Sequence, residues 1–273
     1  MSARNICGLR DFRSLRMRNI FAGLAIIVSA LFTLAPFTPA QTARQSGAES
    51  QTKPQPFDPH DLSGVWVLST PYPGISNQAP PLTAWGQAQF DANKPSFGPR
   101  AVPPALGNDV IGNCDPTGFP RNMFSPSRPV QFIQLPNQLV QLFQYHSARR
   151  TIWTDGRALP KDPDPNWYGY SVGKWDGDTL VVNTVGLNEK TWLDHFGYPH
   201  SEEMRVEERY HRVDHDSFEL VLTVYDPKTY EKPWVSGKKT FKWNPIQELE
   251  EEYCVPSEEG HYNDFMRNPA AGK

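Results

Sequence analysis

The sequence predicts an all-β protein made of one barrel or sandwich domain with about eight to ten strands. Three observations support this. From residue 130 onward, short runs rich in β-branched and aromatic residues follow one another. Tight-turn residues separate them, and no segment of helical period lies between them. Before residue 128, proline and glycine are frequent, which predicts a long proline-rich wrapping segment rather than central strands or helix interiors.

The first 40 residues are predicted to be a secretory signal peptide. Arg16 and Arg18 precede an almost wholly apolar run at 20–35, and Thr-Pro-Ala at 38–40 offers a small residue at the cleavage position. The apolar run is shorter than the roughly 20 residues of a membrane span. We therefore expect a periplasmic or secreted protein with no stable membrane insertion after cleavage. An uncleaved anchor is the alternative.

Residues 41–56 are polar, small and proline-containing, as in flexible linkers, and the folded domain is expected at 57–273. Residues 1–40 carry five arginines and one aspartate, which leaves 22 basic and 29 acidic residues after cleavage. This negative balance argues against nucleic acid as a partner, because nucleic-acid binding needs a basic surface.

Cysteine usage agrees with export. Cys7 lies in the predicted signal peptide, so Cys114 and Cys254 are the only pair in the rest of the chain. In an oxidising compartment two such thiols are most simply one disulfide. A metal site or a catalytic thiol is the alternative, but two isolated cysteines show no ligand spacing.

The elements are expected in the following order. A first strand contains Gly64-Val65-Trp66, and a short helix is expected at 83–93, where apolar residues fall on one side. Further strands are predicted at 130–135, 138–146, 150–154, 168–175, 179–185, 204–213, 218–225, 238–243 and 248–254. The turn signals between them include Pro136-Asn137, Asp155-Gly156, Asp176-Gly177-Asp178 and Asp214-His215-Asp216.

The Gly-x-Trp at 64–66 resembles the opening of lipocalins and the wider calycin superfamily, whose antiparallel barrels close over an apolar cavity. Three further stretches are similar to motifs of a large group of secreted bacterial proteins of unassigned function. They are CDPTGFPR at 114–121, RRTIWTDGR at 149–157 and the segment 167–212. The resemblance covers most of the chain after residue 61. It implies a single antiparallel calycin-like (lipocalin-like) barrel and no particular activity.

Strand alternation places Glu208 on the same face as Met204, Val206 and Tyr210, so its carboxylate is expected to point into the barrel. A carboxylate there costs several kcal/mol unless it is paired or protonated. Removal from water favours the neutral form of a carboxyl group, which would suit Glu208 to act as an acid or base near neutral pH. The alternative is a structural ion pair with an inward arginine such as Arg150.

His200 lies in the loop 188–203, where the strand carrying Glu208 begins. Histidine is the usual proton carrier near neutral pH. His200, Glu208 and Arg150 are therefore our predicted catalytic residues for acid–base chemistry on a carbonyl or hydroxyl group. The alternative is that His200 bonds a backbone carbonyl and anchors the loop.

Four residues are predicted to contact a bound molecule. They are Asn188, Trp192, Tyr168 and Tyr210. Several aromatic residues of 153–192 are candidates for a pocket wall or for ordinary core. Asp194, His195 and His200 are potential metal ligands, but their spacing matches no recognised metal-binding motif, so no metal is predicted. Ser201 lies in no Gly-x-Ser-x-Gly elbow, which argues against a serine triad.

Two functions fit these observations. The first is a secreted enzyme without cofactor, a lyase, isomerase or hydrolase acting on a hydrophobic small molecule in the barrel cavity. The alternative is a non-catalytic, lipocalin-like protein that binds or transports a hydrophobic or aromatic small molecule. Convergence of Glu208, Arg150 and His200 on an open cavity would favour the enzyme. A cavity filled by side chains would weaken both hypotheses.

Overall fold

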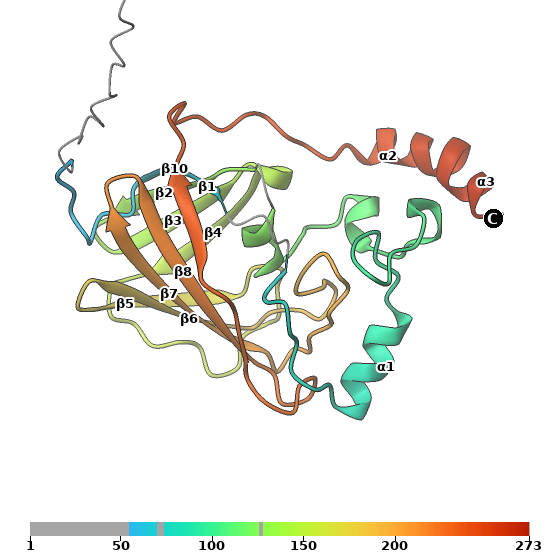
Figure 1. Cartoon of the computed structure of the whole chain (residues 1–273), viewed down its shortest axis with the longest axis horizontal. Coiled ribbons are helices and arrows are strands. Elements are labelled where there is room, and N and C mark those ends of the chain that lie inside the picture. The colour runs from blue at the N-terminus through green and yellow to red at the C-terminus, as the bar shows by residue number, and fades with distance from the viewer. Residues whose placement is uncertain (1–54, 70–73, 126–127, 273) are drawn as a thin grey trace, which may run out of the picture. The chain divides into compact units, whose positions relative to one another are not determined.

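The computed structural model describes residues 55–69, 74–125 and 128–272. Within them, ten strands form one sheet in the order β10-β1-β2-β3-β4-β5-β6-β7-β8-β9, and a further pairing of β10 with β8 closes all but β9 into a barrel (Figure 1). The predicted signal peptide and nearly all of the predicted linker lie outside the described residues. None of the helices in the described ranges has the length and apolar character needed to cross a bilayer.

The strands are β1 (Gly64–Leu68), β2 (Val130–Leu135), β3 (Gln138–Phe143), β4 (Ala148–Trp153), β5 (Tyr170–Asp176), β6 (Thr179–Val185), β7 (Arg205–Asp214), β8 (Ser217–Tyr225), β9 (Trp234–Val235) and β10 (Lys239–Trp243). The α-helices are α1 (Ala84–Ala92), α2 (Pro256–Tyr262) and α3 (Asn268–Ala270). Short 3-10 turns lie at Pro104–Leu106, Val110–Asn113, Arg121–Phe124 and Tyr145–Ser147, and a π-helical turn at Asn263–Arg267 joins α2 to α3. The predicted all-β barrel is confirmed.

The predicted helix at 83–93 is also confirmed. Thr83 is its N-cap, and the Thr83 hydroxyl accepts a hydrogen bond from the Gly86 amide at 3.0 Å. Such caps satisfy one of the backbone donors that a helix start leaves free. A backbone bridge between Leu82 and Tyr230 holds this start against the residues that follow β8.

Two features of the sheet differ from the prediction. The barrel is not purely antiparallel, because β4 and β5 pair in parallel through Ile152–Ser171 and Trp153–Val172. The intervening residues 154–169 are too many for a hairpin and contain three prolines, so they return the chain to the same end of the sheet. The predicted strand at 248–254 is wrong, since these residues pair with no strand among those described.

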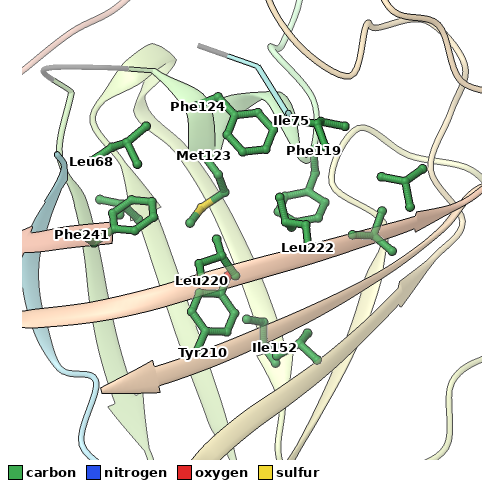
Figure 2. Close-up of a cluster of buried hydrophobic side chains, with 14 of the residues drawn as sticks. Leu68, Ile75, Phe119, Met123, Phe124, Ile152, Tyr210, Leu220, Leu222 and Phe241 are labelled. Atoms are coloured by element: carbon green, nitrogen blue, oxygen red, sulfur yellow. The ribbon is translucent and has the colours of Figure 1, made fainter. Parts of the chain in front are cut away.

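Side chains fill the barrel interior. Every residue of 117–125 is buried, and we call this segment the plug. Figure 2 shows Phe119, Met123 and Phe124 of the plug among side chains of the barrel strands. The proline-rich part of the chain therefore supplies core to the barrel, in the space where the calycin resemblance implies a cavity.

The predicted disulfide is confirmed, since Cys114 and Cys254 are bonded across a sequence separation of 140 residues. Cys114 ends the 3-10 turn that precedes the plug, and Cys254 precedes α2. The bond therefore ties the plug's N-terminal side to the C-terminal segment.

We expect reduction of this disulfide to lower the free energy of unfolding by about 4 kcal/mol, because the unfolded chain regains the entropy of a long closed loop. The check is chemical denaturation of the purified protein with and without dithiothreitol. The Cys114→Ser/Cys254→Ser variant serves as control and should not respond to the reductant. An unchanged midpoint for the reduced wild-type protein would contradict the prediction.

Candidate functional site

A buried ion pair between Arg150 of β4 and Glu208 of β7 lies inside the barrel. Arg150 Nη1 donates to Glu208 Oε1 at 3.0 Å, and Nη2 donates to Oε2 at 2.5 Å. The two residues are 2 % and 0 % exposed. Bidentate charge-assisted bonds of this kind are among the strong hydrogen bonds of proteins. Glu208 thus faces inward, as strand alternation predicts, and its partner is the arginine named as the structural alternative.

Four more polar side chains join this pair, and we call the six together the interior polar network. Arg150 donates from Nε to Ser171 Oγ at 3.0 Å and from Nη2 to Thr184 Oγ1 at 2.6 Å. It also donates from Nη1 to Gln141 Oε1 at 3.1 Å. The Tyr210 hydroxyl donates to the Glu208 carboxylate and accepts from Gln141 Nε2.

The network leaves no open position for a substrate. All three guanidinium nitrogens and both carboxylate oxygens have partners, and the Phe119 ring of the plug covers the guanidinium at 3.7 Å from its centroid. Burial, followed by the charge of Glu208, raises the pKa of Tyr210 well above its usual value, so its hydroxyl stays a donor. The hydrogen bonds of the network fix the positions of the Arg150 and Glu208 charges and connect the strands that carry these side chains.

His200 is also buried but belongs to a different set of contacts. Its Nε2 lies 3.2 Å from Thr191 Oγ1, and its Nδ1 lies 3.3 Å from the Ser201 carbonyl oxygen. Burial lowers its pKa to about 4. Within the described chain no hydrogen bond or ion pair joins His200 to Glu208 or Arg150. Its geometry is that of a loop anchor, the alternative to proton transfer.

The predicted ligand-contacting residues do not meet in one pocket. Asn188 accepts from the Lys190 amide in a local turn at 3.2 Å. Trp192 lies 5.3 Å from the Arg121 guanidinium, and Tyr210 belongs to the interior polar network. Burial raises the pKa of Tyr168 to about 12. None of five pockets on the described residues is lined by any predicted catalytic or ligand-contacting residue.

One of these pockets has the character of a small-molecule site. Its volume is about 500 Å³, and we call it the aromatic pocket; it is lined by Asn77, Phe90, Phe97, Pro99, Arg100, Phe196 and Tyr198. Asn77 precedes α1, and Phe90 belongs to α1. Phe97, Pro99 and Arg100 lie in the segment that follows α1. Phe196 and Tyr198 lie in the loop between β6 and β7. The pocket thus lies where the helix meets that loop, outside the barrel interior.

Two glycines bring the walls of the aromatic pocket together. Gly98 has φ +78°, and a Cβ there would lie 2.4 Å from the Phe196 ring. Gly197 has φ +85°, and its carbonyl accepts from Asn93 Nδ2 at 2.8 Å. Residues that carry a side chain rarely adopt such φ values without strain. The Phe-Gly steps of the two loops therefore allow the close approach that forms the pocket.

Ring packing and a buried carboxylate hold the walls in place. Phe90 and Tyr198 stack with centroids 4.6 Å apart, and Tyr198 packs edge-on against Trp234 at 4.8 Å. Asp194 Oδ1 accepts from the Phe196 amide at 2.9 Å. Burial raises the pKa of Asp194 to about 7. These contacts hold Phe196 and Tyr198, the two wall residues from the loop between β6 and β7, in place.

Sequence reasoning missed this pocket. The expected helix at 83–93 includes Phe90, and the sequence patterns assign no site role to Phe97, Arg100 or Phe196. The available signal was the repeated Phe-Gly step in two proline-containing loops. The described residues contain no group of three or more His, Cys, Asp or Glu side chains arranged to hold a metal ion. Comparisons with protein-family models, with curated proteins and with solved structures found no match for this chain.

We expect Glu208→Gln to destabilise the fold by about 3 to 5 kcal/mol, because it leaves the Arg150 charge buried without a counter-charge. Urea unfolding of the purified variant measures this change. The double variant Arg150→Met/Glu208→Leu removes both charges and should recover most of the loss. A Glu208→Gln protein within 1 kcal/mol of wild type, on the order of a neutral hydrogen bond, would refute the structural role.

Acid should destabilise the protein through His200. Its folded-state pKa of about 4 lies below the ordinary histidine value of 6.5. The stability due to its neutral form is therefore present above pH 6.5 and is lost as pH falls toward 4. The loss amounts to at most about 3 kcal/mol. Unfolding free energies at pH 7 and pH 4.5 should differ less in His200→Gln than in wild type. Equal differences in the two proteins would contradict this assignment.

Proposed function

We propose that this protein binds a hydrophobic or aromatic small molecule in the aromatic pocket and does not transform it. The observation that carries the proposal is the pocket itself, in which four aromatic rings from three segments line an open hollow of about 500 Å³. Small-molecule sites are typically concave, about 300 to 1,000 Å³ in volume, and mostly apolar with a few polar groups. The aromatic pocket has this size and this chemistry.

The pocket walls are fixed before a ligand arrives, which supports binding. The Phe90–Tyr198 stack, the Asn93–Gly197 hydrogen bond and the close packing of Phe196 on Gly98 connect α1 with both loops. A site that is already ordered loses less conformational entropy when it binds. Aromatic rings add large contact areas with few rotatable bonds.

The contacts of the predicted catalytic residues favour binding over catalysis. Glu208 and Arg150 are saturated by their own network, and His200 is bonded to Thr191 and Ser201. An acid–base residue must reach the proton that it transfers. On this geometry the barrel, which we take to be calycin-like, acts as a scaffold that carries the pocket on its loops.

We further propose that the protein works in the periplasm or outside the cell. The Cys114–Cys254 disulfide supports this placement, because such bonds persist mainly in oxidising compartments. The predicted signal peptide is consistent with it.

The proposal predicts saturable binding of a neutral apolar dye such as N-phenyl-1-naphthylamine, with a dissociation constant in the micromolar range. Phe196→Ala and Tyr198→Ala should each weaken binding at least about tenfold, because each removes one aromatic wall. Fluorescence titration measures the affinity, and thermal melting verifies that each variant is folded.

The matched control is Phe57→Ala, which removes a partly exposed ring that does not line the aromatic pocket and should bind the dye as wild type does. Mass spectrometry after prolonged incubation should recover the dye unchanged. Wild-type protein without saturable binding, or a folded Phe196→Ala variant with wild-type affinity, would rule out the aromatic pocket as the site.

A further inference from the structure

Arg100 gives the aromatic pocket one positive charge. It is the only charged residue among those that line the pocket. Its guanidinium carbon lies 3.9 Å from the centroid of the Phe90 ring. This stacking orients the guanidinium, and its desolvation penalty is small because a guanidinium is weakly hydrated. No carboxylate within the described chain lies within ion-pair distance of it.

The structural contacts of Arg100 leave this charge only partly compensated. Nη2 donates to the Asn93 carbonyl oxygen at 3.0 Å and approaches that of Asp91 at 3.5 Å. These carbonyls lie at the C-terminal end of α1, where a cation is favourable. Nη1 is buried and has no hydrogen-bond acceptor among the described residues. A cap for α1 therefore explains part of the arrangement and leaves the charge of Arg100 without a carboxylate partner beside the aromatic pocket.

The other polar groups of the pocket also favour an acceptor-rich ligand. The Asn77 side chain is exposed and lines the same pocket, and its amide can donate. The Tyr198 hydroxyl keeps its proton at neutral pH, because burial and the charge of Asp194 raise the pKa of this group. Arginine, amide and phenol groups can all donate hydrogen bonds into one site.

We propose that the ligand of the aromatic pocket is an aromatic carboxylate, with its ring among the aromatic walls and its carboxylate bound by Arg100. This inference rests on the proposed function and adds the chemical class of the ligand. The protein carries net negative charge, so a general attraction for anions is not expected. Recognition of the carboxylate depends on the local charge of Arg100.

The test compares 2-naphthoate with 2-naphthamide, two probes of nearly equal shape that differ in charge. Isothermal titration calorimetry at pH 7.4 gives both dissociation constants for each protein. Wild type should bind 2-naphthoate at least about tenfold more tightly, the ratio expected for a charge-assisted hydrogen bond. In Arg100→Gln this ratio should fall to near one.

The matched control is Arg157→Gln. Arg157 also stacks on an aromatic ring, with its guanidinium carbon 3.7 Å from the Trp153 centroid, but it does not line the aromatic pocket. This variant should keep the wild-type ratio. Thermal melting of each variant confirms that it is folded.

The outcomes separate the two proposals. Equal binding of both probes by wild type, or an unchanged ratio in a folded Arg100→Gln variant, would overturn the carboxylate inference and leave the pocket intact. Loss of both probes to the same extent in Arg100→Gln would assign Arg100 to the cap of α1 alone. Failure of wild type to bind either probe would overturn the pocket proposal itself.

Discussion

The burial of two opposite charges inside the barrel is the constraint on which the rest of the fold depends. Each buried ion costs several kcal/mol of desolvation, which is offset only if every polar atom finds a partner. The interior polar network meets this condition with side chains from five consecutive strands, β3 to β7. A slip of one residue in any of these strands would turn its side chain outward. The network thereby sets the strand register, including that of the short parallel pair β4–β5, which Arg150 and Ser171 bridge.

The plug follows from the same constraint. A charged pair in an open cavity would be hydrated, and its hydrogen bonds would compete with water. Phe119 covers the Arg150 guanidinium, and Met123 and Phe124 lie among the hydrophobic side chains of the barrel core (Figure 2). The barrel is consequently a solid scaffold. The aromatic pocket accordingly lies outside the barrel interior, among the loops beyond the strands.

The parts of the fold that were predictable from sequence are those determined locally. The Asp176-Gly177-Asp178 turn, the alternation that turns Glu208 inward and the Thr83 cap each depend on a few neighbouring residues. The parallel pairing of β4 with β5 depends on where a proline-rich crossover returns the chain, which no local pattern encodes. The plug has no period to detect, and the aromatic pocket combines residues about a hundred positions apart. For these reasons the sequence predicts a site inside the barrel and does not indicate the aromatic pocket.

The distribution of titratable groups bears on whether the pocket favours binding or catalysis. The groups with strongly shifted pKa values, such as Asp194, His195 and His200, are largely or wholly buried and line none of the five pockets. The residues that line the aromatic pocket offer a guanidinium, a phenol and an amide, and all three groups can donate hydrogen bonds. Such groups can attract and orient an anion. This chemistry is consistent with the proposed binding of a ligand.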